Sequence, residues 1–120
     1  MIYHITSNKA WQEAQKLGEY KTDSLEIEGF IHCSTEEQVI KVANAFYQGQ
    51  SDLIVLCIEP AKLRSSLKWE EPAHLNTEAQ PNVSPQEKFP HLYGVVNLDA
   101  VIKTIPLIAS KDGFFWTING

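Results

Sequence analysis

The sequence predicts a single α+β domain in which two helices pack on a mixed or split β-sheet. Its 120 residues match the length of one domain. The order of elements is strand, helix, strand, helix, and then mostly strands. A doubly wound parallel sheet needs more crossover helices than the second half of the chain offers. The composition, 43% hydrophobic and 21% charged, is typical of a folded globular domain.

The first strand–helix unit is predicted from residues 2–18. Residues 2–6 predict a first strand, with Ile2, His4 and Thr6 on one face and Tyr3 and Ile5 on the other. Apolar residues then recur at helical spacing over 8–17, behind a cap at Ser7 or Asn8. Gly18 gives the helix a left-handed stop.

The second unit begins with a polar loop over 19–26 and a strand over 27–34. Ser34 and Glu37 have the spacing of a capping box, which predicts a helix that starts directly at Ser34. The apolar face of that helix consists of Val39, Ile40, Ala43, Phe46 and Tyr47.

The middle of the chain starts with a continuous apolar run over 53–58, which predicts a central strand covered on both faces. A short helical turn within 60–67 and a brief strand over 67–70 follow, with Leu67 and Trp69 facing inward. Residues 71–88 contain three prolines and no periodicity, which predicts a long surface loop.

The last third predicts a strand over 91–96, a turn over 97–100 and a strand over 101–107. We therefore divide the chain into a domain, 1–107, and a C-terminal tail, 108–120. The tail contains an aromatic segment, 113–116, that can dock on the body of the domain or on a partner.

Charge and cysteine content restrict the functional classes. Fifteen acidic residues against ten basic ones give a net charge of −5, which argues against broad nucleic-acid binding. The sequence has no apolar run of membrane-spanning length and no signal-peptide pattern at its start, so we expect a cytoplasmic protein without a membrane partner. Cys33 and Cys57 lie in apolar strands and are expected to be buried thiols.

Three of the four histidines, His4, His32 and His91, lie in strands that are otherwise apolar. A single such histidine is more often a packing residue than a functional one, but three suggest a shared site. Glu70 follows Trp69, where partial burial can adjust its pKa. We take His4, His32, Glu70 and His91 as candidate catalytic residues.

Two further residues are candidates for ligand binding. Tyr93 shares a strand face with His91 and can stack on a planar ring; cross-strand packing is the alternative. Ser34 at a helix start can bind a diphosphate or serve as a plain N-cap. Metal-ligand spacings such as HxH or HExxH are absent, so a metal site formed by the three histidines remains only an alternative. Walker and G-x-G-x-x-G motifs are also absent.

Four motifs together resemble a known family. They are Ile2-Tyr-His-Ile5, Gly29-Phe-Ile-His-Cys-Ser34, Trp69-Glu70 and Phe89-Pro-His-Leu-Tyr-Gly94. In this order they resemble the domain of unknown function 952 family of short, mainly bacterial proteins, over residues 1 to about 106. That family looks like a distant member of the ADP-ribosyltransferase-like superfamily, whose members bind NAD in a cleft between two small sheets.

The resemblance implies a role for each candidate residue. Glu70 would stabilise an oxocarbenium-like centre as the bond from nicotinamide to ribose breaks. His4 would hold a ribose hydroxyl or the nicotinamide amide, and His91 would act as a general acid or base. His32 and Ser34 would meet the diphosphate, and Tyr93 would stack on the nicotinamide ring.

The resulting expectation is a small protein that binds NAD or ADP-ribose and catalyses ADP-ribosyl transfer or related chemistry. NAD would be a substrate, and no cofactor is firmly implied. One alternative is a metal-dependent enzyme that uses the three histidines, and another is a non-catalytic ligand-binding module. The oligomeric state is left open.

Overall fold

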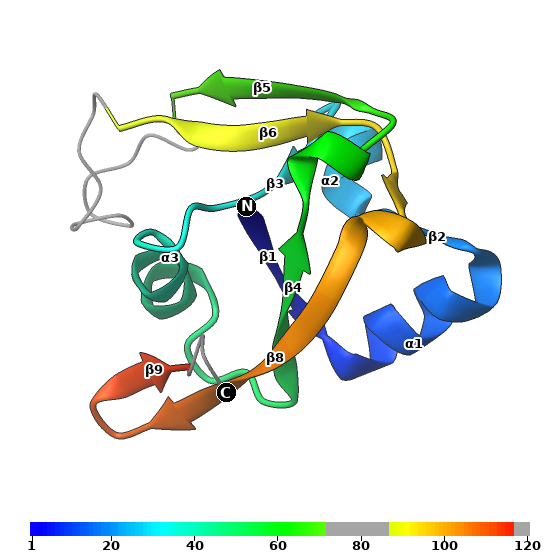
Figure 1. Cartoon of the computed structure of the whole chain (residues 1–120). Coiled ribbons are helices and arrows are strands. Elements are labelled where there is room, and N and C mark those ends of the chain that lie inside the picture. Colours follow the sequence, from blue (N-terminus) through cyan, green and yellow to red (C-terminus); the bar gives the residue numbers. More distant parts are fainter. Residues whose placement is uncertain (72–86, 117–120) are drawn as a thin grey trace.

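The longer strands are divided between a four-stranded sheet and a three-stranded sheet (Figure 1). The computed structural model describes residues 1–71 and 87–116. Its elements are β1 (Ile2–Ser7), α1 (Asn8–Leu17), β2 (Glu19–Tyr20), α2 (Asp23–Ile27), β3 (Ile31–His32), α3 (Val39–Phe46), β4 (Leu53–Ile58), η1 (Pro60–Lys62), β5 (Ser66–Glu70), β6 (Phe89–Tyr93), β7 (Val96–Asn97), η2 (Leu98–Ala100), β8 (Val101–Ser110) and β9 (Gly113–Phe115). All the strand pairings in these ranges are antiparallel, so the predicted α+β class is confirmed with a split rather than a mixed sheet.

The four-stranded sheet has the order β1-β4-β8-β9, and β4 lies inside it as predicted. All six residues of β4 are buried. One face of the sheet packs against α1, β3 and β6, with Ile54, Leu56 and Ile58 from β4. The other face packs against α3, with Leu53, Val55 and Cys57 from β4 and Phe114 from β9. A strand covered on both faces has no polar alternation, which explains the unbroken apolar run.

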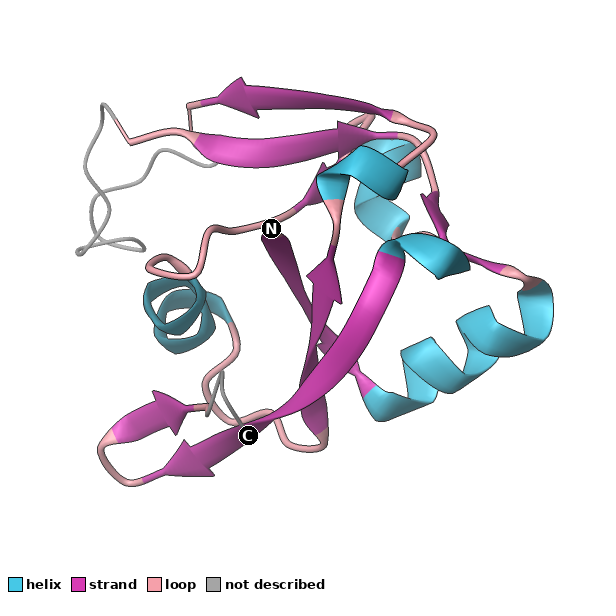
Figure 2. Ribbon diagram, in the orientation of Figure 1, coloured by secondary structure: helices cyan, strands magenta, loops and turns pink. Residues whose placement is uncertain are grey.

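The three-stranded sheet has the order β3-β6-β5 and lies across the top of the molecule in Figure 2. It is joined to β1 by one antiparallel bridge between Tyr3 and Ser34. The Tyr3 amide donates to the Ser34 carbonyl at 2.8 Å, and the Ser34 amide donates to the Tyr3 carbonyl at 2.7 Å. β1 is otherwise an edge strand, which becomes important at the site.

Helix α1 confirms the first predicted helix and both of its ends. Ser7 is the N-cap and its hydroxyl accepts a hydrogen bond from the Ala10 amide at 3.1 Å. Gly18 ends the helix at φ 91°, in the left-handed region that a glycine adopts without strain.

The prediction for residues 19–34 is wrong in its details. The expected loop contains β2 and the five-residue helix α2, and the expected eight-residue strand is reduced to β3. Gly29, at φ 90°, turns the chain sharply between α2 and β3. Because this turn lies inside the apolar stretch, an extended strand cannot begin at Ile27.

The predicted capping box at Ser34 is also wrong. The backbone of Ser34 pairs with Tyr3, so this residue is extended, and α3 begins only at Val39. The carbonyl oxygen of the Gln38 side chain accepts from the Thr35 amide at 2.9 Å. Ser34 therefore does not supply the helix N-terminus that was expected to receive a diphosphate.

The predicted turn within 60–67 and the strand near 67–70 are observed as η1 and β5. Leu67 packs on the core, but Trp69 is 50% exposed, so the expectation that Trp69 faces inward is wrong. Most of the predicted 71–88 loop, residues 72–86, lies outside the described residues.

Part of the predicted tail belongs to the main sheet. β8 continues to Ser110, and β9 turns back to pair with it. Phe114 is buried beside α3, and the Trp116 ring meets the Tyr3 ring edge to face at 5.2 Å. Residues 108–116 thus dock on the body of the domain.

Two other features concern the membrane and the thiols. None of the helices in the described ranges has the length and hydropathy needed to cross a bilayer.

Cys33 and Cys57 are buried free thiols, as predicted.

Candidate functional site

A cavity of about 510 Å³ opens along β1. Its lining residues come from β1, β2, α2, β3, α3, β4, β6 and adjoining loops, and they include three imidazoles, several hydroxyl-bearing side chains and several apolar ones. The lining residues are His4, Ile5, Thr6, Ser7, Tyr20, Thr22, Asp23, Ser24, His32, Cys33, Ser34, Val42, Phe46, Tyr47, Gln50, Leu53, Phe89 and His91. His4, His32 and His91 thus meet in one cavity, although 87 positions separate the first from the last.

His4 is a buried imidazole whose two nitrogens are both used within the protein. Its Nδ1 donates to the His32 carbonyl at 2.6 Å, since a carbonyl oxygen can only accept. Its Nε2 lies 2.7 Å from the Tyr20 hydroxyl, which also lies 2.9 Å from the Thr6 hydroxyl. Burial lowers the pKa of His4 to about 4, so the ring is neutral near pH 7. His4 therefore connects β1, β2 and β3 at the cavity wall.

His32 stands at the cavity as a half-exposed ring held by a carboxylate. Its Nε2 lies 2.9 Å from Oε2 of Glu28, which is in the turn after α2. Ser24 helps to shape this turn because its hydroxyl donates to the Phe30 carbonyl at 2.8 Å. The pair places an imidazole and a carboxylate together at the wall formed by α2 and β3.

His91 forms a second imidazole–carboxylate pair. Its Nδ1–H donates to Oε1 of Glu70 at 2.9 Å, and its side chain is only 3% exposed. Burial lowers the pKa of His91, and the hydrogen bond to Glu70 partly offsets this. Because Nδ1 carries the proton, Nε2 is the basic nitrogen of the neutral ring. Nε2 has no hydrogen-bond partner among the described residues, and His91 lines the cavity.

Glu70 lies behind His91 and not in the cavity wall. Tyr93 donates its hydroxyl to the same Oε1 at 2.5 Å. The hydrogen bonds from Tyr93 and His91 keep the pKa of Glu70 below its usual range, so it is a carboxylate near pH 7. Hence Glu70 is placed to orient His91, not to touch a molecule in the cavity.

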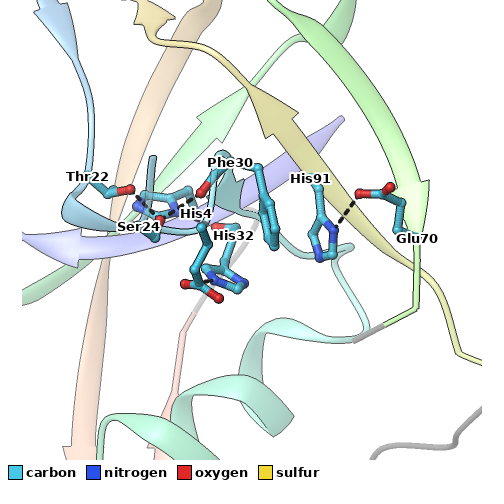
Figure 3. A network of polar contacts seen from close by, with 8 residues as sticks. His4, Thr22, Ser24, Phe30, His32, Glu70 and His91 are labelled. Atoms are coloured by element: carbon cyan, nitrogen blue, oxygen red, sulfur yellow. Dashed lines mark hydrogen bonds and ion pairs between the residues drawn. The ribbon is translucent and has the colours of Figure 1, made fainter. Parts of the chain in front are cut away.

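Phe30 connects the two pairs. Its ring stacks on His91 at 4.1 Å and meets His32 edge to face at 4.8 Å. Figure 3 shows Phe30 beside one face of His91, with Glu70 beyond it. The centroids of His32 and His91 are 5.7 Å apart. Phe30 thereby holds both imidazoles in fixed orientations.

The two candidate binding residues are placed differently. Ser34 lines the cavity, although it starts no helix. Tyr93 is 36% exposed, lies outside the cavity wall and has Lys68 Nζ 4.9 Å from its ring centroid. The structure thus brings Ser34 and the three histidines together, and leaves Glu70 and Tyr93 behind His91.

Sequence reasoning missed Tyr20, Glu28 and Phe30. Phe30 carried a signal, because alternation along the strand placed it on the same face as His32. No such signal marked Tyr20 and Glu28. Tyr20 lies in β2 and Glu28 follows α2, and the sequence analysis predicted neither element.

The three histidines do not form a metal site in this arrangement. Among residues 1–71 and 87–116, no group of three or more His, Cys, Asp or Glu side chains is placed to hold a metal ion. Both nitrogens of His4 are already hydrogen-bonded, so its lone pair is not available to a metal. The alternative of a three-histidine metal enzyme gains no support from the structure.

The fold and site together define a class: a small α+β domain with a histidine-lined cavity at the edge of its main sheet. In a comparison with protein families, residues 5–104 match the model of "Protein of unknown function (DUF952)". The chain belongs to this family.

Solved structures show the same fold. The crystal structure of protein CC0527 from Caulobacter crescentus is similar with a TM-score of 0.78 and 28% identity, over 98% of this chain and 94% of that chain. The crystal structure of a double mutant of CC0527 gives a TM-score of 0.77. The solution NMR structure of CC0527 gives 0.72 at 30% identity, over 94% of this chain and 89% of that one. A search of curated proteins found no match.

Proposed function

We propose that the cavity binds NAD through its nicotinamide and adjoining ribose, and that the protein catalyses ADP-ribosyl transfer or a related cleavage of the bond between them. This proposal includes the ADP-ribosyltransferase-like assignment of the fold. The observation that carries it is the open backbone edge of β1 at Ile5, which lies in the same cavity as the imidazoles.

The open edge follows from strand geometry. In an antiparallel pair, residues alternate between hydrogen-bonding to one neighbour and to the other. Tyr3 bonds outward to Ser34, so Ile5, two residues later, also directs its N–H and C=O away from β4. Ile5 lines the cavity. No described residue forms a hydrogen bond with the outward-facing Ile5 N–H or C=O. These two groups can therefore bind the C=O and NH₂ of a carboxamide, in the way that a sheet edge binds an added strand.

The surrounding side chains suit a ribose. Hydroxyls of Ser34 and Thr22 line the cavity, and the His32 imidazole stands beside them. Such groups form hydrogen bonds with sugar hydroxyls.

His91 provides the acid–base group. In transfer to an acceptor hydroxyl, the bond from ribose carbon to the pyridinium nitrogen breaks, and its electron pair neutralises the ring. The acceptor oxygen forms the new bond to that carbon, and its proton passes to Nε2 of His91. Glu70 keeps Nδ1 protonated and stabilises the imidazolium that forms. In this account Glu70 is a positioning residue, in place of the direct role that the resemblance implied.

Isothermal titration with NAD, ADP-ribose and a 2′-phosphorylated nucleotide tests the binding. We expect NAD to bind, and we expect His91→Gln to slow nicotinamide release by about 100-fold or more while leaving the affinity for NAD nearly unchanged. The control is Lys103→Gln, outside the cavity lining. If a folded sample binds none of the three ligands, the proposal is wrong. Binding without nicotinamide release under any condition would instead identify a non-catalytic binding module.

A further inference from the structure

The distribution of positive charge limits which part of a dinucleotide the cavity can hold. The ten Lys and Arg residues of the chain all fall within the described residues. None of them lines the cavity. Proteins usually hold phosphates with Arg, Lys or free backbone amides at a helix N-terminus. Basic side chains are therefore excluded as diphosphate ligands inside this cavity.

The N-termini of the three α-helices in the described residues do not replace the missing basic side chains as phosphate ligands. α3 starts at Val39, away from Ser34. α2 has five residues and carries Asp23 and Glu26 in its first turn, which oppose an anion. At the start of α1, the Asn8 amide donates to the Asp52 carbonyl and the Ala10 amide to the Ser7 hydroxyl.

Negative charge instead lies at the cavity. Asp23 is one of its lining residues, and the Glu28 carboxylate is 2.9 Å from the His32 ring. The net charge of −5 adds a field that disfavours a dianion. The negative charge near this cavity therefore stabilises a bound cation and destabilises a bound diphosphate.

One wall of the cavity is apolar. It includes Val42 and Phe46 of α3 and Tyr47 directly after the helix, while polar residues of the lining come from α2 and β2. Figure 1 shows α3 on one side of β1 and α2 with β2 on the other. Phe46 is 44% exposed. A partly exposed aromatic ring at a cavity is a platform for a planar ring.

We infer that the cavity selects a cationic pyridine ring joined to a ribose, and that the diphosphate of a dinucleotide contributes nothing to binding. This inference rests on the proposed function and narrows its substrate class to the nicotinamide riboside unit. Phe46 stacks on the ring and Asp23 favours its positive charge.

A matched pair of ligands tests the inference. Nicotinamide riboside and nicotinamide mononucleotide differ by one phosphate. In calorimetric titrations we expect the mononucleotide and NAD to bind no more tightly than the riboside. We also expect reduced nicotinamide riboside, whose ring is neutral, to bind about fivefold more weakly. Raising the salt concentration should weaken NAD binding no more than riboside binding, because no cationic phosphate site is screened.

Two pairs of variants test which cavity residues bind the riboside. Asp23→Asn should weaken riboside binding about fivefold, while Glu26→Gln, on the same helix and outside the cavity, should not. Phe46→Leu should weaken it about tenfold, consistent with the loss of a stacked ring. Phe115→Leu, at a similarly exposed phenylalanine outside the cavity, is the control.

The outcomes separate the two proposals. If NAD or the mononucleotide binds tenfold more tightly than the riboside, the inference is wrong and the proposed function stands. If ADP-ribose binds and the riboside does not, the inference is wrong and so is the proposed binding of NAD through its nicotinamide. If none of these ligands binds to folded protein, both are overturned. Equal effects of Phe46→Leu and Phe115→Leu would refute the assignment of the ring platform.

Discussion

His4, a predicted ligand contact, lines the cavity but has both ring nitrogens hydrogen-bonded within the protein. Its ring nitrogens meet the His32 carbonyl and the Tyr20 hydroxyl, so its side chain serves to position the cavity wall. The sequence shows only that His4 is a histidine within a predicted strand. Its partners come from β2 and β3, which alternation along β1 cannot reveal.

His4 also gives the protein a defined pH dependence of stability. Its pKa is lowered from 6.5 to about 4 in the folded state, so the unfolded chain binds this proton more readily. The free energy of unfolding should therefore fall as the pH drops from 6.5 to 4, by about 3 kcal/mol from this residue. Urea denaturation at several pH values measures it. His4→Asn should flatten this slope; an unchanged slope would show that His4 is not buried as a neutral ring.

A second prediction concerns the pKa of His91, which is hydrogen-bonded to Glu70. Burial lowers the pKa of His91, and Glu70 raises it. Glu70→Gln removes the raising influence, so the pKa of His91 should fall further, as measured by NMR titration of the imidazole. Glu71→Gln, the neighbouring carboxylate, is the control. A His91 pKa that stays constant or rises in Glu70→Gln would show that the two side chains are not paired.

Among the elements, β1, α1 and β4 were predictable from sequence because local signals and tertiary structure agree there. α1 has a capping serine and a terminal glycine, and β4 is apolar throughout because both of its faces are covered. The segment from 19 to 38 was not predictable. Ser34 has the local pattern of a helix cap, but its backbone is taken by Tyr3, which is 31 positions away. A long-range pairing overrode a local propensity.

The β8–β9 hairpin adds to the main sheet residues 108–115, which the sequence analysis assigned to a C-terminal tail. The aromatic segment was expected to dock, and the structure places Phe114 in the cluster with α3. Phe114→Ala should lower the free energy of unfolding by about 3–5 kcal/mol, because it leaves a cavity in the core. Phe115→Ala, at a half-exposed neighbour, should cost less than about 1 kcal/mol. Chemical denaturation of both variants compares them. Equal small effects would mean that the hairpin does not contribute to the core.

In the whole molecule, the site exists because two sheets meet at β1 through a single bridge. Past that bridge, the edge of β1 stays open, and β3 and β6 bring His32 and His91 beside His4. The sequence indicated a site shared by three imidazoles, since each of them interrupts an apolar strand. It did not indicate which of them keeps a free nitrogen, because that depends on Glu70, Glu28 and Tyr20 in three separate elements.

The central claim is that the cavity along β1 is the ligand site. Two-dimensional amide NMR of the protein titrated with NAD tests it most directly. We predict that the backbone amide of Ile5 shifts most, together with those of His32 and His91, while Phe115 and Lys103 stay fixed. Saturable shifts confined to surfaces away from β1, or no shifts at millimolar NAD, would contradict the claim.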